Sequence, residues 1–363
     1  WEQRKLGEVA EIVGGGTPST NVSEYWDGNI NWYTPAEISD QIYLESSQRK
    51  ITEEGYSSCS AKMLPVGTVL FTSRAGIGKT AILSRKSCTN QGFQSIVPHK
   101  DKLDSYFVFS RSEELKRYGE TVGAGSTFVE VSGKQMADMD LMLPKNITEQ
   151  QIIGSYFKNL DHLITLHQCK CDYLIRLKYG VFSLLNKTDW EQRKAKSLFV
   201  STADKGHPEL PVLSATQDRG MIRRDENSIN IYHDKKNEEG YKRVLPGQFV
   251  IHLRSFQGGF AHSAIEGITS PAYTVFGFSE PEKHNPNYWK YVFTSKEFIR
   301  RLETVTYGIR DGRSISYDEF LTMDFVYPMQ DEQTKIANYL DTLDHLITLH
   351  QQKLKLLKQI KKA

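Results

Sequence analysis

The sequence has little cysteine, no long hydrophobic run and no signal-peptide pattern at its start. Its four cysteines, Cys59, Cys88, Cys169 and Cys171, are too few and too irregularly spaced for a disulfide framework or a four-ligand zinc site. Reduced thiols and a cytoplasmic location are therefore expected. A membrane-spanning helix needs about 18 consecutive apolar residues, and no such run occurs. Because the chain starts at Trp1 and not at methionine, we expect further residues to precede it.

A large excess of one charge is also missing, since 46 Lys and Arg stand against 44 Asp and Glu, a net charge of +2. A protein that neutralises many DNA phosphates by itself usually carries a larger basic excess. Charge alone therefore does not indicate DNA binding. If the chain binds DNA, either its basic residues cluster on one face or partner subunits supply much of the contact with the phosphates.

What the sequence does contain is an internal repeat that organises the whole chain. The pentapeptide WEQRK occurs at Trp1–Lys5 and Trp190–Lys194, and the octapeptide LDHLITLH occurs at Leu160–His167 and Leu343–His350. The matches keep the same order, which excludes coincidence. The chain is therefore predicted to hold two copies of one unit, each a variable domain followed by a long helix.

The repeat also sets the predicted domain boundaries. A hydrophobic, strand-like stretch that ends in proline precedes each helix, at Pro144 and at Pro328. Outside the helices the two copies differ widely, as expected if the helices meet equivalent partners while the domains have different tasks. We predict a first domain over residues 1–144, a central helix within 145–189, a second domain over 190–328 and a C-terminal helix over 329–363.

Both variable domains are predicted to be mixed α/β. Thr68–Thr72 and Gln248–Leu253 have the β-branched and aromatic content of strands, and each follows a turn that contains Pro and Gly. Tyr106–Tyr118 and Tyr288–Leu302 have the spacing of amphipathic helices. The predicted fold class is therefore α/β, with two mixed α/β domains joined by two long helices.

The two helical parts carry the apolar pattern of a coiled coil. Mostly apolar residues alternate at steps of four and three from Ile153 to Val181 and again from Ile336 onward. The first helix is predicted from Thr148 to Asn186, a rod of roughly 55–60 Å. A single helix with so narrow an apolar seam is not stable alone. The two helices are therefore expected to pack antiparallel as a pseudo-twofold pair. The residues expected in helix packing and partner docking are Leu160, Ile164, His167, Leu174, Leu343, Ile347, His350 and Leu357.

His167 and His350 occupy equivalent positions in this seam. One interpretation is a pH-sensitive or metal-binding pair. The other, which we favour, is a polar core position that specifies the register of the helices. Two histidines do not complete a metal site without further ligands, and none is apparent in the sequence.

Two segments resemble catalytic motifs without completing them. Gly76–Thr80 ends like a phosphate-binding loop, but Ser73 stands where that motif has its first glycine. Asn285–Tyr288 resembles the N-P-P-[FY] motif of amino-methylating enzymes, but it lacks the second proline and is equally typical of a helix start. No paired carboxylates, Ser/His/Asp order or metal-ligand cluster can be assembled. We therefore expect no catalytic site in this chain.

Glycine-containing basic loops follow the predicted strands at corresponding places in both domains. Arg presents a bidentate fork to guanine or to phosphate, and Gln reads adenine in a similar way. The alternative is an ordinary solvated hairpin loop, but the repeat favours DNA contact. The predicted DNA-binding residues are Ser73, Arg74, Gly76, Lys79, Ser126 and Thr127 in the first domain and Arg254, Ser255, Gln257, Arg310 and Arg313 in the second.

Taken in order, these motifs resemble the specificity subunits of type I restriction–modification systems. The resemblance rests on W-E-x-x-K-L-G-E-V at Trp1–Val9, TPST at Thr17–Thr20, TSR-x-x-IGK at Thr72–Lys79 and NQGF at Asn90–Phe93. It also rests on the helix signature P…EQ-x-x-I…LD-x-x-I, which occurs twice. Ser197–Val212 in the second domain lacks the LGEV and TPST landmarks.

The resemblance implies that the α/β domains are target recognition domains, each of which reads one half of a split sequence in double-stranded DNA. The helices would set the spacer between the half-sites and dock two methyltransferase subunits, which in turn carry the restriction subunits. S-adenosylmethionine, ATP and Mg²⁺ would act in those partners, and this chain would bind no cofactor and no metal. The alternatives are a coiled-coil scaffold protein without DNA specificity and a self-contained DNA methyltransferase, for which the chain shows no glycine-rich cofactor loop.

Overall fold

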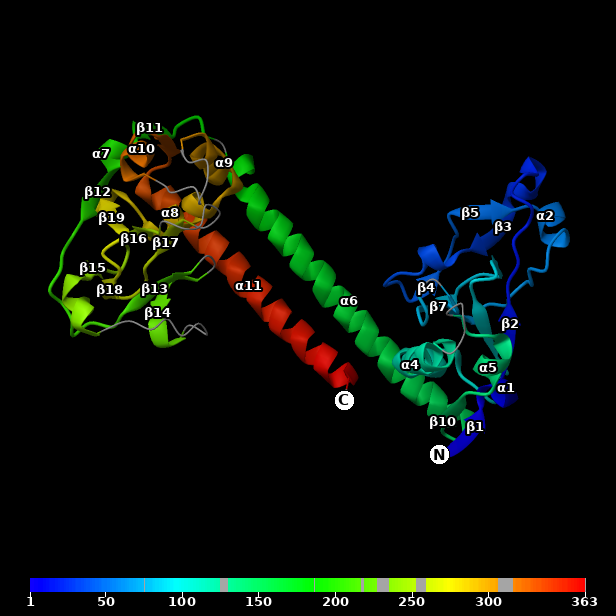
Figure 1. The fold of residues 1–363 in the computed structure, drawn as a ribbon. Helices are drawn as coiled ribbons and strands as arrows, with labels where there is room; N and C mark the ends of the chain where they lie inside the picture. The colour runs from blue at the N-terminus through cyan, green and yellow to red at the C-terminus, as the bar shows by residue number, and fades with distance from the viewer. Residues whose placement is uncertain are drawn as a thin grey trace. The chain divides into compact units, whose positions relative to one another are not determined.

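The computed structural model describes residues 1–74, 76–124, 130–185, 187–216, 219–226, 235–252, 259–305 and 316–362. The chain divides into two compact units, Trp1–Leu166 with Lys355–Ala363, and His167–Leu354. The long helices α6 (Ile147–Leu184) and α11 (Gln330–Lys362) each contribute to both units (Figure 1). Within the described residues, no helix combines the length and the apolar character needed to cross a membrane. The boundaries at 144, 189 and 328 stay predictions.

The first unit packs helices on a five-stranded sheet of order β2-β9-β6-β7-β4, with a three-stranded sheet β5-β3-β8 and the pair β1-β10. Its strands are β1 (Glu2–Lys5), β2 (Ala10–Gly14), β3 (Trp26–Tyr33), β4 (Tyr43–Leu44), β5 (Arg49–Ile51), β6 (Val69–Phe71), β7 (Thr80–Leu83), β8 (Cys88–Thr89), β9 (Gln94–Pro98) and β10 (Asp140–Leu143). Its shorter helices are α1 (Leu6–Val9), α2 (Glu53–Ser57), α3 (Ser105–Ser110), α4 (Ser112–Gly123) and α5 (Gly133–Ala137), with 3-10 turns at Ser23–Tyr25 and Pro35–Glu37. The core forms where α3, α4 and α5 cover the five-stranded sheet.

The second unit is built around a four-stranded sheet of order β12-β19-β16-β17, with the pairs β13-β14, β15-β18 and β11-β20. Its strands are β11 (Glu191–Lys194), β12 (Phe199–Thr202), β13 (Leu213–Thr216), β14 (Gly220–Arg223), β15 (Lys242–Val244), β16 (Phe249–Ile251), β17 (Phe260–His262), β18 (Gly267–Thr269), β19 (Thr274–Phe278) and β20 (Asp324–Tyr327). Its shorter helices are α7 (Ala195–Leu198), α8 (Pro286–Thr294), α9 (Lys296–Val305) and α10 (Tyr317–Leu321), with 3-10 turns at Arg224–Glu226, Lys235–Gly240 and Pro281–Lys283.

The repeat seen in the sequence is a repeat of topology. The order β12-β19-β16-β17 matches β2-β9-β6-β7, and both sheets are antiparallel at these positions. The two WEQRK stretches become β1 and β11, and each pairs with the strand that precedes a long helix, β10 or β20. The segment Ser197–Val212 lacks the sequence landmarks of the first copy but still ends a short helix, α7, and forms β12 at the place of β2.

The strand and turn predictions are confirmed with shorter bounds. β6 and β16 lie inside the predicted strands, and the preceding glycines Gly67 and Gly247 have φ of 87° and 86°. A positive φ of this size strains any residue with a Cβ, so glycine is the residue these turns require.

The prediction of two single amphipathic helices was wrong, because each is a pair of shorter helices. Tyr106–Tyr118 is divided at Arg111, between α3 and α4. Tyr288–Leu302 is divided at Ser295, whose ψ of 145° is extended and whose Oγ accepts from the Phe298 backbone N–H at 3.1 Å. A serine that caps the next helix in this way ends the preceding one, and apolar periodicity does not register such a break.

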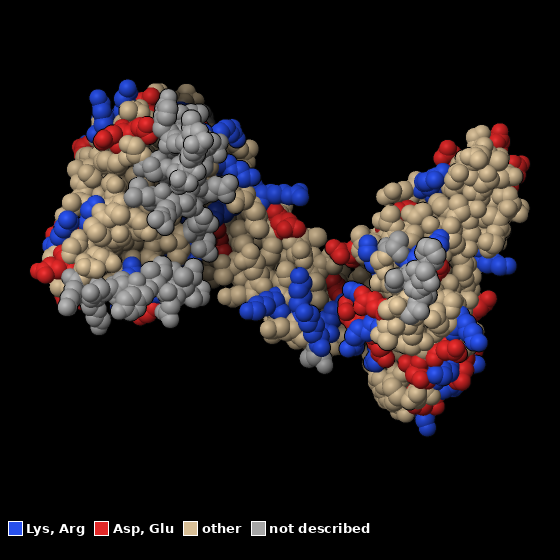
Figure 2. Space-filling view, in the orientation of Figure 1, with Lys and Arg blue, Asp and Glu red and all other residues tan. Residues whose placement is uncertain are grey.

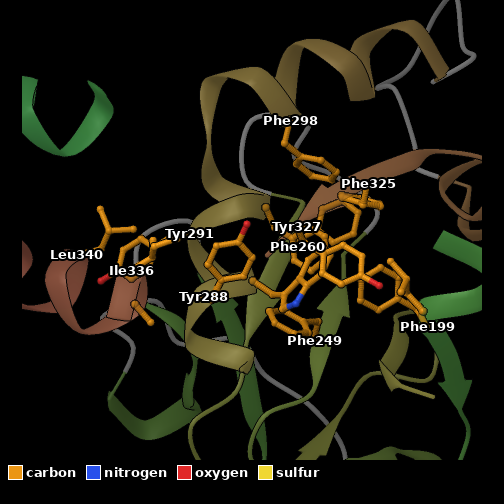
Figure 3. Packing of buried hydrophobic residues seen from close by; sticks show 14 of the residues in the cluster. Phe199, Phe249, Phe260, Tyr288, Tyr291, Phe298, Phe325, Tyr327, Ile336 and Leu340 are labelled. Carbon is orange, nitrogen blue, oxygen red and sulfur yellow. The ribbon is translucent and has the colours of Figure 1, made fainter. Parts of the chain in front are cut away.

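The core of the second unit is largely aromatic. Phe199, the first residue of β12, is 3% exposed. Figure 3 shows Phe249, Phe260 and Phe298 around the same space, and Tyr291 beside Ile336 and Leu340 of α11. The core is therefore continuous with the packing of the long helix. The rings that contact Phe199 come from β19, α8, α10 and β20, and are Phe276, Phe278, Trp289, Phe293, Phe320 and Phe325.

The long helices α6 and α11 form the predicted antiparallel coiled coil. In the second unit His167 contacts His350, and Lys178, further along α6, contacts Asp344, which lies nearer the start of α11. The direction of α11 is therefore opposite to that of α6. Of the seam residues, Leu160, Leu174, Leu343 and Ile347 are buried, and Ile164, His167, His350 and Leu357 are partly buried.

The histidine pair is a polar contact inside this seam. The Nδ1 atoms of His167 and His350 lie 2.8 Å apart, so one ring donates to the other. Two nitrogens that bind one tetrahedral zinc at ~2.0–2.1 Å would lie about 3.3 Å apart. Burial, and then the charge of His167, lower the pKa of His350. This geometry favours the polar core interpretation over a metal pair.

A buried glutamine joins each domain to its long helix. Gln150 is 1% exposed, and its Nε2 donates to the carbonyl oxygens of Lys102 and Pro144 at 3.0 and 3.1 Å. Its Oε1 accepts from the backbone N–H of Asp104, the N-cap of α3, at 3.1 Å. Gln333, which is 0% exposed, makes the matching bonds in the second unit, to Lys283, Pro328 and Asn285.

We expect Gln150→Ala to lower the free energy of unfolding by about 2–4 kcal/mol, because it leaves buried backbone groups without partners at ~1–3 kcal/mol each. Urea denaturation of the variant measures this loss. Gln151→Ala is the matched control, since Gln151 is the exposed neighbour on the same helix and should change stability by less than about 0.5 kcal/mol. Equal losses in the two variants would contradict the proposed role of the amide.

Candidate nucleic-acid interface

Three sequence motifs that are far apart along the chain meet at one end of the first sheet. The Ser73 backbone N–H, in the loop after β6, donates to Gly92 at 2.9 Å. The Thr17 hydroxyl, in the TPST motif, donates to the Gln91 side chain at 2.6 Å. The Gly16 backbone N–H donates to Thr89 at 2.9 Å. The loops Gly14–Thr20, Thr72–Lys79 and Asn90–Phe93 therefore form one surface.

The loop between β6 and β7 is held closed by the side chain of Thr72. Its hydroxyl donates to the Gly76 carbonyl at 2.7 Å and accepts from the Lys79 N–H at 3.0 Å. Gly76 and Gly78 have φ of 105° and 94°, values that favour glycine. After Lys79 the chain continues directly into strand β7. A phosphate-binding loop would lead into a helix, so the geometry agrees with the sequence in excluding that motif.

Of the residues predicted to contact DNA in this loop, Arg74, Gly76 and Lys79 are accessible and Ser73 is not. The Arg74 side chain is 37% exposed and lies 4.0 Å from the Glu130 carboxylate, a distance that leaves the guanidinium available to a stronger acceptor. Ser73 is 0% exposed, so the prediction that its side chain contacts DNA is corrected. Its backbone instead fixes the loop, by bonds to Gly92 and to Val131.

The turn Asn90–Gly92 supplies candidate residues that the prediction missed. Gln91 is exposed, and Thr17 holds its amide in one orientation. Asn90 Oδ1 accepts from the Gly92 N–H at 2.9 Å, which shapes the turn. A held glutamine amide in a turn that is hydrogen-bonded to the loop of Arg74 suits the reading of base edges. TPST at Thr17–Thr20 and NQGF at Asn90–Phe93 both stand out in the sequence, but nothing in their spacing indicates that they lie beside the loop of Arg74.

The second unit carries a hairpin at the corresponding place. β16 and β17 pair antiparallel as β6 and β7 do, and the His252 N–H donates to Gly259 at 3.1 Å at the base of their connection. The His252 ring lies 6.0 Å from that of Tyr273, in the turn that corresponds to Asn90–Gly92. The predicted residues Arg254, Ser255, Gln257, Arg310 and Arg313, and Ser126 and Thr127 of the first unit, lie outside the described residues.

Charge on the face shown in Figure 2 is mixed. Figure 2 shows Lys and Arg interspersed with Asp and Glu over both units on the face in view, as the net charge of +2 leads one to expect. Over the described part of the chain, no three His, Cys, Asp or Glu side chains gather closely enough to hold a metal ion. Among the described residues, the accessible cationic side chains in the loop between β6 and β7 are Arg74 and Lys79.

Both long helices carry a second apolar stripe that their own seam does not cover. In the first unit Tyr156, Leu163 and Leu166 of α6 are 53%, 40% and 53% exposed. In the second unit Tyr339 and Leu349 of α11, at equivalent positions of the repeat, are 47% and 38% exposed. Each stripe residue directly precedes a seam residue and is therefore turned by about 100° from the seam. Each unit thus leaves apolar side chains of its long helix exposed outside the seam.

Comparison with known proteins finds a family that is similar to slightly less than the first half of the chain. Residues 1–172 match the family described as "Type I restriction modification DNA specificity domain". This part of the chain is similar to that family. The matched residues include the candidate interface of the first unit and the first part of α6, but not the hairpin of the second unit. The resemblance noted from the motifs is thereby confirmed.

The matched part of the chain is also similar to curated proteins. The type I restriction enzyme MjaIX specificity subunit of Methanocaldococcus jannaschii is 36% identical over 165 residues, 44% of this chain and 38% of the relative. The type I restriction enzyme EcoR124I/EcoR124II specificity subunit of Escherichia coli is 29% identical over 170 residues, 45% of this chain and 41% of the relative. The match thus spans only 38–41% of the length of these relatives.

Solved structures extend the likeness in fold beyond the specificity domain. The crystal structure of a type I restriction–modification S subunit from M. genitalium has a TM-score of 0.59 at 12% identity, covering 100% of this chain and 94% of that one. A chain from a structure on complex assembly and conformational transition of the type I R-M system has a TM-score of 0.50 at 15% identity over 99% of this chain. At such identities the likeness concerns the fold alone.

Proposed function

We propose that this chain is the DNA sequence-recognition subunit of a type I restriction–modification complex and that it reads a bipartite target with one domain per half-site. The observation that carries this proposal is the duplicated fold with unlike loops. Strands β6 and β7 and strands β16 and β17 occupy the same place in two sheets of the same order, while the connections between them differ in sequence. Two equal scaffolds with different loops suit two unlike half-sites.

The docking of two methyltransferase subunits is supported by the exposed apolar stripes. Tyr156 and Leu166 in one unit correspond to Tyr339 and Leu349 in the other, and all four are exposed, so two copies of one partner would meet similar side chains there. Leu346, the counterpart of the exposed Leu163, instead packs against the core of the second unit. The seam residues Leu160, Leu174, Leu343 and Ile347 are buried between α6 and α11 and would act through the shape of the coiled coil. Restriction subunits would associate through the methyltransferase subunits.

In this proposal the chain has no catalytic role. Methyl transfer from S-adenosylmethionine, and ATP- and Mg²⁺-dependent translocation with cleavage, belong to the partner subunits. The residues proposed to touch DNA are Arg74, Gly76, Lys79 and Gln91 at the described interface, with Ser126, Thr127, Arg254, Ser255, Gln257, Arg310 and Arg313 as further sequence-based candidates.

The proposal is tested by expressing the chain with its cognate methyltransferase subunit in a methylation-free host and sequencing the methylome. We expect one new methylated motif, with two short specific halves around a fixed number of unspecified bases. The methyltransferase subunit expressed alone is the control and should give none. Replacing the second domain by that of a related subunit should change one half-site and leave the other unchanged.

A verified complex without any new methylated motif would exclude the recognition role. A coiled-coil scaffold function would then be the better account of the long helices. Binding of S-adenosylmethionine by the purified chain alone would instead support a self-contained methyltransferase.

A further inference from the structure

Two matching sets of side chains lie where the domains meet the coiled coil. In the first unit Asp161 Oδ1 accepts from Lys361 Nζ at 2.5 Å, and its Oδ2 accepts from the Tyr106 hydroxyl at 2.9 Å. In the second unit Asp344 accepts from Lys178 at 2.5 Å, and the Tyr291 hydroxyl lies 2.8 Å from Asp344 and 2.6 Å from Asp341, so it donates to one of these two carboxylates at a time. Both aspartates hold the second position of the repeated octapeptide.

Each set joins three separate segments. The tyrosine belongs to a domain helix, α3 or α8, the aspartate to one long helix and the lysine to the other. Lys178 and Lys361 also hold equivalent positions, each seventeen residues after the aspartate of its own helix. The two long helices therefore exchange equivalent ion pairs, as a twofold repeat requires.

The polar groups in these sets can select one register, that is, one alignment of α6 with α11 along the coiled coil. The apolar seam repeats every seven residues, so leucines and isoleucines alone permit helices to pair in more than one alignment, whereas specific polar partners distinguish among them. Asp161 is 6% exposed, and a slip by one heptad, about 10.5 Å, would remove the lysine from this shielded carboxylate.

The tyrosines connect that register to the domains. Burial, and then the adjacent carboxylate, raise the pKa of Tyr106. Burial, and then hydrogen bonds to Asp341 and Asp344, raise the pKa of Tyr291. Both hydroxyls therefore stay protonated as donors near neutral pH. Each domain is thereby bound to the aspartate that also receives the lysine of the opposite helix.

We infer that Lys361–Asp161–Tyr106 and Lys178–Asp344–Tyr291 are register locks, whose residues act as positioning residues that determine the length of the unspecified spacer between the two half-sites. This inference rests on the proposed function. A heptad slip of about 10.5 Å corresponds to about three base pairs of duplex. Loss of both locks should therefore widen the range of accepted spacers without changing the half-sites.

The test is the methylome of the complex with Lys178→Met and Lys361→Met combined. Methionine keeps an apolar stem in the seam and removes the charge. Relative to the wild-type chain, we expect at least a ten-fold rise in the methylated fraction of sites with native half-sites and spacers up to three base pairs longer or shorter. Lys170→Met with Lys353→Met removes the same charges at exposed positions of the same helices and should preserve the native spacer.

Further variants separate the register role from a general effect on folding. Lys178→Arg with Lys361→Arg keeps both ion pairs and should restore the single spacer. Tyr106→Phe with Tyr291→Phe removes only two hydroxyls and should broaden the spacer in the same direction, even if the methionine variant does not assemble. An unchanged spacer in complexes that carry either set of variants would overturn the inference. A wild-type complex without a split motif would overturn the proposed function as well, so the two failures are distinguishable.

Discussion

Replacing Phe199 with alanine should lower the free energy of unfolding of the second unit by about 3–5 kcal/mol, the cost typical of removing a large buried aromatic ring. Phe199 is 3% exposed and lies among rings from both layers of the unit, including Phe276, Trp289 and Phe325. Because these rings belong to different elements, they cannot all move inward to fill the cavity. For a unit of this size the melting temperature should fall by roughly 8–15 °C.

The neighbouring strand residue provides the control for this prediction. Val200 follows Phe199 on β12 and is 49% exposed, because successive side chains of a strand point to opposite faces. Val200→Ala should therefore change stability by less than about 1 kcal/mol. Calorimetry or thermal unfolding followed by circular dichroism measures both variants. Similar losses for Phe199 and Val200 would contradict the assignment of this strand and of the aromatic core.

Replacing Arg74 with alanine should weaken binding of the assembled complex to its target duplex by about 1–3 kcal/mol, a factor of roughly 5–150. The residue follows strand β6, its partner Glu130 is distant at 4.0 Å, and the exposed Gln91 lies on the same surface. Arg74→Lys keeps the charge but loses the planar fork, so it should recover only part of the affinity. Fluorescence anisotropy at one fixed salt concentration gives these values.

Arg85 supplies a matched control for Arg74. It is exposed and follows β7, whereas the loop that holds Arg74 precedes that strand, so the two arginines lie at opposite ends of the hairpin strand. Arg85→Ala should leave target affinity within about twofold, because it removes the same charge away from the interface. If Arg74→Ala weakens target and unrelated DNA equally, Arg74 contacts phosphate and not a base edge. If Arg74→Ala leaves the binding of both target and unrelated DNA unchanged, Arg74 does not contact DNA.

Some features of this protein are determined by the sequence itself. The duplicated WEQRK and LDHLITLH segments determine that two equivalent units exist, and the structure pairs both copies of WEQRK with the strand before a long helix. The heptad spacing determines the two long helices and their seam, since a period of 3.5 residues places one apolar stripe along a helix. Gly67 and Gly247 mark turns because few other residues adopt a positive φ. The heptad spacing and the turn glycines are local signals, and the repeat is found by comparing two segments of the sequence directly. None of these features depends on knowing which residues meet in three dimensions.

Other features are decided only by tertiary structure. Ser73 is a reasonable DNA contact in a linear motif, but it is completely buried, and its backbone is hydrogen-bonded to Gly92 and Val131. Gln91 joins Arg74 on one surface because three loops are brought together by pairing of strands that are distant in the chain. Lys361 and Asp161 are two hundred residues apart and meet only because α11 returns along α6. Contacts of this kind depend on the summed packing of two sheets and two helices, and no short window of sequence contains that information.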